Sequence, residues 1–410
     1  MLATADILES LDLHPEESSY RFLERLFARF NARVPFETVS KILRDADVTD
    51  PLRKAGSAES FWEEHLAWGS GGTCFARVAA FSALLEDLGF RVERLLGRVE
   101  ADFDHAALRV RTERGPVLAD VGFPLPALLP EAEGETETPL AGLKVGRSPR
   151  GWAVTLLGGV PDGPPGLEIF SEPIPEADFL ARWRSTFRPD SRFLRGVGVR
   201  RMEEQRVLSF TRGEVRVDDR HSRLAVPVAA PRARRIAELF GLDEIPVQRA
   251  LTRTSDPSSE LTGATLTAYL ETRAAPETAF AAIGSPDAYR RLMSGVASVA
   301  SCDGSPTHWR LELHAPEAEG APATGDTGFS EDVRADPEAG RLDVRRIYPD
   351  RSWESSFEAR SLRGSTYLMR RVTFDGARED LLRNDSARGR LAGTLAIDLL
   401  AWARQIQSGA

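Results

Sequence analysis

The stretch Gly69–Phe90, GSGGTCFARVAAFSALLEDLGF, contains one of only two cysteines in the chain and decides how the rest is interpreted. Apolar residues follow Cys74 around most of a helical circumference, and Gly89 is placed to end the helix. Cys74 therefore stands at the expected start of a buried helix, where backbone N–H groups and the helix dipole favour a thiolate. Gly71 and Gly72 leave room for a carbonyl group to approach the sulfur. The alternative is a small hydrophobic side chain packed in a core, the usual setting of a free cysteine.

Two further residues favour a chemical role for this thiol. His105 begins the alternating segment HAALRV, and Asp120 interrupts the apolar segment VLADVGF. A hairpin turn at TERG would place the two side chains nearly opposite each other. Taken singly, such a histidine is usually a surface or satisfied core group, and such an aspartate often caps a turn. Together with Cys74 they predict a triad in which a carboxylate orients an imidazole and the imidazole activates a thiol.

Composition limits the classes of protein to which the chain can belong. Its 410 residues suggest more than one domain, and its formal net charge is −9 without a dense block of Lys and Arg. We therefore expect no nucleic-acid partner and no membrane partner, and no apolar run approaches the ~20 residues that span a bilayer. The N-terminus lacks the pattern of a signal peptide, and Cys74 and Cys302 form no disulfide framework. A cytoplasmic protein is expected. The six histidines lack metal-ligand spacing, so no metal is expected.

The hydrophobic period changes along the chain. Helices are predicted first, over 19–34, 37–46 and 57–68, the last with Ser60 and Glu63 at capping-box spacing. After Phe90 the pattern alternates, and residues 130–250 are expected to be mainly strands, with one short helix at RARRIAELFG. A stretch rich in Ser, Thr and Pro follows. We therefore predict three parts, namely a domain over 1–250, a linker over 251–261 and a second domain over 262–410.

The first domain resembles the arylamine N-acetyltransferase family. The segments GGTCF, HAALRV and LADVGF are similar to its three signature segments, and VPFETV (Val34–Val39) is similar to its early Pro-Phe-Glu segment. EPIPEADF and STFRPDSRFLRGVGVRR resemble its later barrel region, so the resemblance covers about residues 1–250. It implies an α+β fold with a helical bundle, a β-barrel and a small α/β lid.

The resemblance also implies a reaction. In this family a cysteine takes an acetyl group from acetyl-CoA and passes it to an arylamine, hydrazine or hydroxylamine, and relatives of the same fold close amide bonds on polyketide chains. Carried over, Cys74 is the nucleophile, His105 the base and Asp120 the group that orients the base. Substrate contacts are predicted at Phe36, Gly71, Gly72 and Phe123.

The sequence departs from the family pattern at four positions. Ser70 stands where the family has Arg, Ala76 where it has Glu, Thr38 where it has Asn, and Pro124 where it has a final Gly. The first two departures remove charges from the surroundings of the predicted site. They leave the triad residues in place and bear on the choice of donor and acceptor.

The region 262–410 resembles the START-like superfamily, which includes polyketide cyclase-like proteins. The segment LETRAAPETAFAAIGSPDAYRRLMSGVASV is similar to the opening of that superfamily. The resemblance implies a helix-grip fold, in which a curved sheet wraps a long last helix and leaves an apolar cavity for a hydrophobic ligand. Cys302 and His308 are interpreted as ordinary surface or turn residues.

These features lead to one main hypothesis and two rivals. The main hypothesis is an acyltransferase that moves an acyl group through a Cys74 thioester to a small-molecule amine. The donor would be acetyl-CoA, another acyl-CoA, or an acyl thioester on a carrier protein. One rival is an amide synthase or cyclase of natural-product biosynthesis. The other is a catalytically weak protein that binds hydrophobic ligands, and rapid labelling of Cys74 by iodoacetamide would argue against it.

Overall fold

The computed structural model describes most of the chain, namely residues 3–157, 166–255, 259–293, 296–302, 305–313, 329–347, 352–362, 365–376 and 378–408. The chain divides into two compact units. The first contains Met1–Gly159, Pro164–Arg220 and Val228–Glu260, and the second is formed chiefly by His221–Pro227 and Leu261–Ala410. Within the linker predicted over 251–261, residues 256–258 lie outside the described residues. The two units are described separately below.

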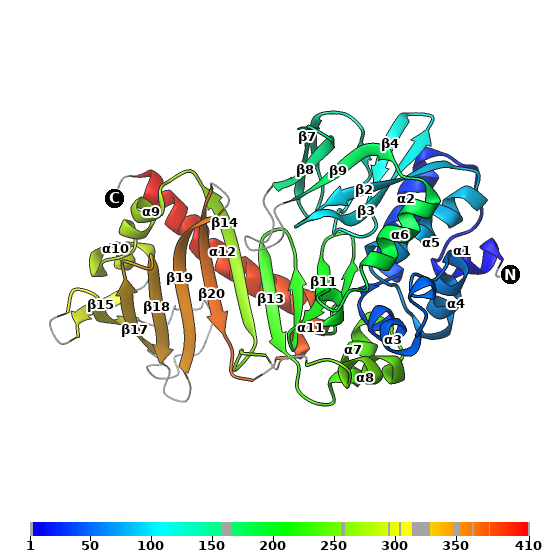
Figure 1. Cartoon of the computed structure of the whole chain (residues 1–410). Helices are drawn as coiled ribbons and strands as arrows, with labels where there is room; N and C mark the ends of the chain where they lie inside the picture. Colours follow the sequence, from blue (N-terminus) through cyan, green and yellow to red (C-terminus); the bar gives the residue numbers. More distant parts are fainter. Residues whose placement is uncertain are drawn as a thin grey trace. The chain divides into compact units, whose positions relative to one another are not determined.

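The first unit opens with helices that pack around a dense aromatic core (Figure 1). They are α1 (Thr4–Ser10), α2 (Tyr20–Arg33), α3 (Val39–Asp47), α4 (Ala58–Trp68) and α5 (Cys74–Asp87). Phe30 of α2 lies 4.7 Å from Phe81 of α5, measured between ring centroids. The capping box of α4 is formed by Ser57 and Ser60, so the predicted pairing of Ser60 with Glu63 is wrong by one turn. The true N-cap precedes the helix by one residue, as the motif requires.

An eight-stranded antiparallel sheet follows, in the order β5-β4-β3-β2-β9-β8-β7-β6. Its first strands are the predicted ones: β2 (Arg91–Arg98), β3 (Asp102–Thr112) and β4 (Gly115–Ala119), with the β3–β4 turn at the predicted place. The remaining strands are β5 (Leu129–Pro130), β6 (Gly134–Glu137), β7 (Gly142–Ser148), β8 (Gly151–Leu157) and β9 (Gly166–Pro173). Alternate side chains of β2 and β3 face opposite sides, so the sheet contributes to two separate cores. Helix α5 packs against β2 and β3 and so brings Cys74 to this sheet.

The rest of the first unit joins distant segments of the chain. β1 (Phe36–Glu37) pairs with β10 (Val199–Met202), which continues to β11 (Val207–Thr211) and β12 (Glu214–Asp218). Three helices complete the unit, α6 (Glu176–Ser185), α7 (Arg232–Phe240) and α8 (Glu244–Leu251). The sequence predicted only α7. Helix α6 buries just Phe179 and Trp183, so its apolar stripe is too sparse to produce a clear helical period.

The second unit is an antiparallel sheet with a long helix on it. The strand order is β13-β14-β20-β19-β18-β17-β16-β15, and α12 (Asp385–Gln407) lies along β14 and β20 (Figure 1). The strands are β13 (Ser222–Pro227), β14 (Thr265–Thr272), β15 (Val296–Ser301), β16 (His308–Leu313), β17 (Phe329–Asp336), β18 (Arg341–Ile347), β19 (Ser352–Leu362) and β20 (Ser365–Thr373). The shorter helices are α9 (Pro276–Ala281), α10 (Pro286–Leu292) and α11 (Asp380–Arg383). Large aromatic side chains fill the described interior, notably Tyr289, Trp309, Phe357 and Trp402, all fully buried.

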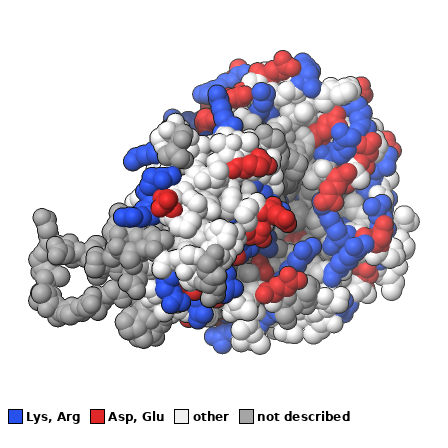
Figure 2. Space-filling model, turned by 90° about the vertical axis from the view of Figure 1, so that its left-hand side faces the viewer, with Lys and Arg blue, Asp and Glu red and all other residues white. Residues whose placement is uncertain are grey.

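His308 begins β16, and its Nε2 lies 2.8 Å from Asp332 Oδ1, so this ring has a partner that the sequence did not indicate. The surface charges of the chain are mixed. On the face drawn in Figure 2, Lys and Arg side chains are interspersed with Asp and Glu side chains. None of the helices in the described ranges is both long and apolar enough to cross a bilayer.

Candidate active site

Cys74, His105 and Asp120 come together in the first unit. Cys74 is the first residue of α5, and its Sγ lies 3.9 Å from the carbonyl oxygen of Asp104 in β3. His105 follows in the same strand, and its Nε2 lies 2.6 Å from Asp120 Oδ2. All three triad side chains are buried. Because Nε2 faces the carboxylate, Nδ1 is the ring nitrogen left for the thiol.

Cys74 and His105 both lie directly against Gly122. A Cβ atom placed on Gly122 would lie 2.5 Å from Cys74 Cβ and 3.0 Å from His105 Cε1. Such distances are well inside van der Waals contact. Cys74 and His105 therefore flank the backbone of Gly122, and any side chain at this position would displace one of them.

Local hydrogen bonds fix the carboxylate of Asp120 in place. Its Oδ1 accepts from the backbone N–H groups of Gly122 and Phe123, both at 2.8 Å, which leaves Oδ2 for His105. This is the Asx-type turn that favours aspartate directly after a strand. The ring of Phe123 meets the imidazole edge-on, with centroids 6.3 Å apart. The imidazole is thus held by a carboxylate at one nitrogen and by an aromatic wall.

The charge on His105 follows from its neighbours. Burial alone lowers the pKa of His105, but the charge and hydrogen bond of Asp120, together with Cys74, outweigh burial and raise the pKa to about 10. The ring is therefore an imidazolium at neutral pH. A cation beside the sulfur favours the thiolate, the nucleophilic form of cysteine.

The turn that carries Cys74 into the helix is held by a second buried carboxylate. Glu37 is fully buried, and its Oε1 accepts from the N–H groups of Gly71 at 3.0 Å and Gly72 at 2.6 Å. A Cβ on Gly71 would lie 1.7 Å from the carbonyl oxygen of Pro35, and Gly72 has φ of +61°. These glycines are therefore required by the close approach of the chain to itself, which differs from the predicted reason of room for a substrate.

Two arginines hold the loop that contains Asp120. Arg77, one turn after Cys74 in α5, is buried, and its Nε donates to the carbonyl oxygen of Val121. Its Nη1 donates to the carbonyl oxygen of Val34 at 2.7 Å. Arg200 Nη2 donates to the carbonyl oxygen of Gly122 at 2.7 Å. The loop after β4 is thus bound through two successive carbonyl groups, so its position depends on both arginines.

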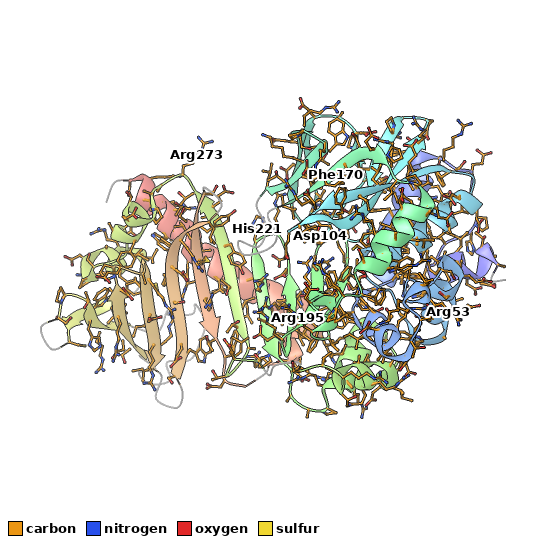
Figure 3. The ribbon with its side chains drawn as sticks, viewed as in Figure 1. Arg53, Asp104, Phe170, Arg195, His221 and Arg273 are labelled. Atoms are coloured by element: carbon orange, nitrogen blue, oxygen red, sulfur yellow. The ribbon has the colours of Figure 1, made fainter. Side chains whose placement is uncertain are left out.

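The other predicted residues lie around this centre. Phe36 of β1 pairs with Arg200 of β10, and Arg200 stacks over its ring with Cζ 4.8 Å from the ring centroid. Phe36 is therefore connected to the Asp120 loop through Arg200. Ser70 and Ala76, which replace the family's charged pair, both line a neighbouring pocket. The carboxylate of Asp104, a residue labelled in Figure 3, accepts from the N–H groups of Val99, Glu100 and Ala101, and these bonds shape the β2–β3 turn.

Sequence reasoning missed Glu37 and Arg77 as parts of the site. Both carry a charge inside an otherwise apolar segment, VPFETV and CFARVAAF respectively. A charged residue in such a segment must find partners when the segment is buried, so this contrast is the signal that would have identified them. Within the ranges that the structure describes, no cluster of His, Cys, Asp or Glu is arranged to hold a metal ion.

Comparison with known proteins agrees with this geometry. Residues 20–140, which include the triad, match a family model described as N-acetyltransferase. No curated protein matches the chain.

Three solved structures, all under 25% identical, share the fold. Arylamine N-acetyltransferase from M. smegmatis is 22% identical, with a TM-score of 0.54 over 62% of this chain and 100% of that chain. The Mycobacterium marinum enzyme in complex with CoA is 19% identical, with a TM-score of 0.52 over 60% and 98%. The Salmonella typhimurium enzyme is 21% identical, with a TM-score of 0.52 over 62% and 99%. The predicted resemblance is thus supported for the first part of the chain, and the START-like assignment of residues 262–410 stays a prediction.

Proposed function

We propose that the protein is an acyltransferase that holds an acyl group as a thioester on Cys74 and passes it to an amine. The observation that carries this proposal is the buried arrangement of Cys74 at the start of α5 beside an imidazole bound to Asp120 at 2.6 Å. A cysteine placed in this way has a histidine that can take its proton and a carboxylate that orients that histidine.

In the first half-reaction the Cys74 thiolate attacks the carbonyl carbon of the acyl thioester. The carbonyl oxygen gains negative charge, and the N-terminal end of α5 is an electropositive place for it. The bond to the donor sulfur then breaks, and the imidazolium of His105 supplies a proton to the leaving thiolate. The acyl group remains on Sγ.

In the second half-reaction the amine attacks the Cys74 thioester. His105, now neutral, accepts the proton that the amine loses, and the Cys74 thiolate leaves. The imidazolium and the thiolate are restored together, so the cycle consumes one donor and one amine. Because donor and acceptor use the same sulfur in turn, the kinetics should be ping-pong.

The similar fold of an arylamine N-acetyltransferase that binds CoA supports acetyl-CoA or another acyl-CoA as the donor. Phe123 beside His105, and Phe36 under Arg200, provide aromatic surface near the catalytic loop. Aromatic surface of this kind favours an aromatic amine as the acceptor. A donor carried on an acyl carrier protein would use the same chemistry.

A second candidate is an amide synthase that joins a larger acyl chain to an amine. Ser70 and Ala76 favour it, because small uncharged side chains line the pocket where the family places Arg and Glu. The chemistry at Cys74 is the same, and only the size of the acyl group differs. A screen of acyl-CoA chain lengths separates the two candidates.

The proposal is tested by incubating the protein with a series of acyl-CoA donors and measuring its intact mass. We expect one acyl group per chain, located on the peptide that contains Cys74 and removed by an arylamine. Cys74→Ser should give no thioester, while Cys302→Ser should behave as the parent protein does. Acylation that persists in Cys74→Ser would contradict the mechanism.

A further inference from the structure

Lysine is a rare residue in this chain, and one lysine is buried. Only three of the 53 Lys and Arg residues are lysines, namely Lys41, Lys54 and Lys144. Lys54 lies 2.5 Å from Asp45 and Lys144 lies 3.3 Å from Glu135, so both are ion-paired near the surface. Lys41 is only 4% exposed. Nearly all other cationic side chains of this protein are arginines, so the burial of a lysine at position 41 needs a physical explanation.

Lys41 has an unusual set of contacts for a buried cation. Its Nζ donates to the hydroxyl of Thr186 and lies 4.3 Å from the ring centroid of Phe187. No carboxylate within the described ranges lies at ion-pair distance from it. The charged groups that follow it in α3 are paired elsewhere: Arg44 binds Glu64, and Asp45 binds Lys54. The ammonium group is therefore removed from water without a counter-ion, an arrangement that costs free energy.

The titration of Lys41 reflects this environment. Burial lowers the pKa of Lys41 to about 8, and the negative charges of Cys74 and Asp45 oppose the shift only in part. At neutral pH the side chain is still mostly protonated. A bound anion would supply the missing charge and raise the pKa of Lys41 again.

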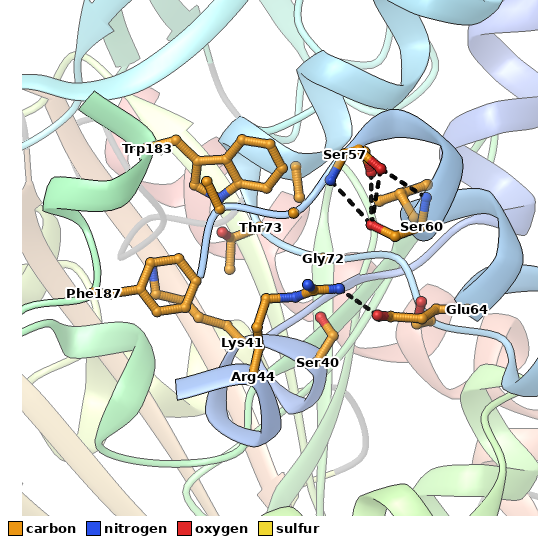
Figure 4. Close-up of a pocket in the computed structure, with 15 residues that line it drawn as sticks. Ser40, Lys41, Arg44, Ser57, Ser60, Glu64, Gly72, Thr73, Trp183 and Phe187 are labelled. Atoms are coloured by element: carbon orange, nitrogen blue, oxygen red, sulfur yellow. Dashed lines mark hydrogen bonds and ion pairs between the residues drawn. The ribbon is translucent and has the colours of Figure 1, made fainter. Parts of the chain in front are cut away.

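Lys41 lines a pocket beside the loop that leads to the candidate nucleophile (Figure 4). The pocket opens to solvent, and none of the three triad residues is part of its wall. Phe61, Ala76 and Trp183 give the wall an apolar surface. Arg44 and Glu64 also line the pocket, but they form an ion pair with each other, so Lys41 is the charge of the described wall that no carboxylate balances. Thr73 is the N-cap of α5, yet its side chain makes no capping hydrogen bond, so its hydroxyl is available to a ligand.

We propose that this pocket binds a small organic carboxylate, with its oxygens on the Lys41 ammonium and the Thr73 hydroxyl and its apolar part against Phe61 and Trp183. The cation and the start of α5 both favour an anion at this place. The apolar wall favours a monocarboxylate over phosphate or sulfate, because a multiply charged ion would lose more hydration than one lysine returns. The proposal goes beyond acyl transfer, since the binding residues are separate from the triad.

Binding at this pocket has a consequence for Cys74. Lys41 would stabilise both the Cys74 thiolate and the bound carboxylate. Because the two anions share this one cation, each anion makes the other less stable. Gly72 and Thr73 form the pocket wall and directly precede Cys74, which gives a short route between the two places. Coupling of this kind is reciprocal for binding free energies. We expect the carboxylate to slow alkylation of Cys74 and a reacted Cys74 to bind the carboxylate more tightly.

The low lysine content makes a direct experiment possible. Protein grown with lysine labelled by ¹³C at Cε should give three lysine signals, assigned with Lys41→Met, Lys54→Met and Lys144→Met. Benzoate is titrated in as the probe at constant ionic strength, and benzamide serves as the neutral analogue of the same shape. We expect benzoate to shift only the Lys41 signal, to saturate, and to raise the titration midpoint of that signal above about 8.

Two variants test the assignment further. Lys41→Met should lose benzoate binding measured by calorimetry, while Lys54→Met, which removes a paired lysine, should bind as the parent does. Should Lys41→Met fail to fold, Thr73→Val provides the second test, with an expected loss of at least about tenfold in affinity for one hydrogen bond to a carboxylate. Equal responses to benzoate and benzamide, or a Lys41 signal that benzoate leaves unchanged, would overturn the proposal. Neither result would affect the test of Cys74 acylation.

Discussion

Gly122→Ala is the substitution that tests the candidate active site most directly. Gly122 contributes only backbone hydrogen bonds, which alanine keeps, and its φ lies outside the left-handed region, so alanine is compatible with the backbone. The added methyl group would nevertheless lie 2.5 Å from Cys74 Cβ, 3.0 Å from Cys74 Cα and 3.0 Å from His105 Cε1. Carbon atoms that are not bonded normally approach to about 3.5–4.0 Å. The thiol and the imidazole must therefore separate by roughly 1 Å.

The size of the effect follows from this displacement. Overpacking of a buried site typically costs about 1–3 kcal/mol of folding free energy. A misplacement of about 1 Å between reacting groups costs on the order of 10²-fold in rate. Since Cys74 begins a buried helix and His105 is bound to Asp120, neither group moves away without breaking other contacts. We therefore expect Gly122→Ala to fold, with lower stability, and to acylate Cys74 about 100-fold more slowly.

Gly134→Ala is the matched control, because a Cβ at Gly134 meets no atom within 4 Å. Both variants are compared in urea unfolding, in the rate of Cys74 acylation by an acyl-CoA, and in the rate of alkylation by iodoacetamide. Gly134→Ala should match the parent in all three measurements. If Gly122→Ala also acylated at the parent rate, the close approach of Cys74 to His105 would be irrelevant to the reaction, and the triad assignment would fail.

Three further outcomes are expected. Asp120→Asn should slow acylation by a factor on the order of 10⁴ in stopped-flow mass measurements, because the amide cannot stabilise the imidazolium, and near-parent activity would make Asp120 purely structural. The pKa of His105 is raised to about 10, so its ion pair with Asp120 stabilises the fold in full below the ordinary pKa of 6.5 and progressively less as the pH rises through about 10. The unfolding free energy of the parent should therefore exceed that of His105→Gln by an amount that falls between these two pH values. A difference that stays constant with pH would refute the charged pair. Glu37→Gln should lower the unfolding free energy by about 1–3 kcal/mol in urea titrations, because the amide keeps one oxygen for the two glycine N–H groups but places an NH₂ group where Oε2 accepts from the Ser40 N–H, and an unchanged value would show that water replaces the lost bond.

The sequence predicts the positions of those helices and strands whose apolar residues recur with a strong period. Helices α2 and α5 and the strands around His105 lie where the pattern predicted them, since each buries a continuous face. That Cys74, His105 and Asp120 come together could also be predicted, because Cys74 and His105 each begin a patterned segment and Asp120 interrupts an apolar one. Helix α6 was missed because it buries only two aromatic side chains. Short amphipathic segments of this kind are decided by tertiary packing, which a single sequence does not display.

The parts of the site that could not be predicted are those made by distant pairings. Phe36 and Arg200 are neighbours only because β1 pairs with β10. The local sequence around neither residue predicts this strand pairing. The pocket around Lys41 combines α3, α4, the start of α5, and α6 with the segment after it, which lie far apart in sequence. A chemical group can be recognised from its type and local pattern. Its counterpart across the fold depends on a topology that the local pattern does not contain.

The loss of charge at Ser70 and Ala76 bears on whether the site is functional or a remnant. A remnant should show a catalytic loop held only by local bonds, because selection no longer maintains distant contacts to it. Here the carbonyl groups after Asp120 accept hydrogen bonds from Arg77 and Arg200, which come from two other elements. Each arginine has to be desolvated to do so, which costs free energy unless its hydrogen bonds are made. A buried cation, Arg77, and a half-buried one, Arg200, thus hold one loop from two other elements, and we expect the uncharged Ser70 and Ala76 to change the substrate and leave the reaction in place.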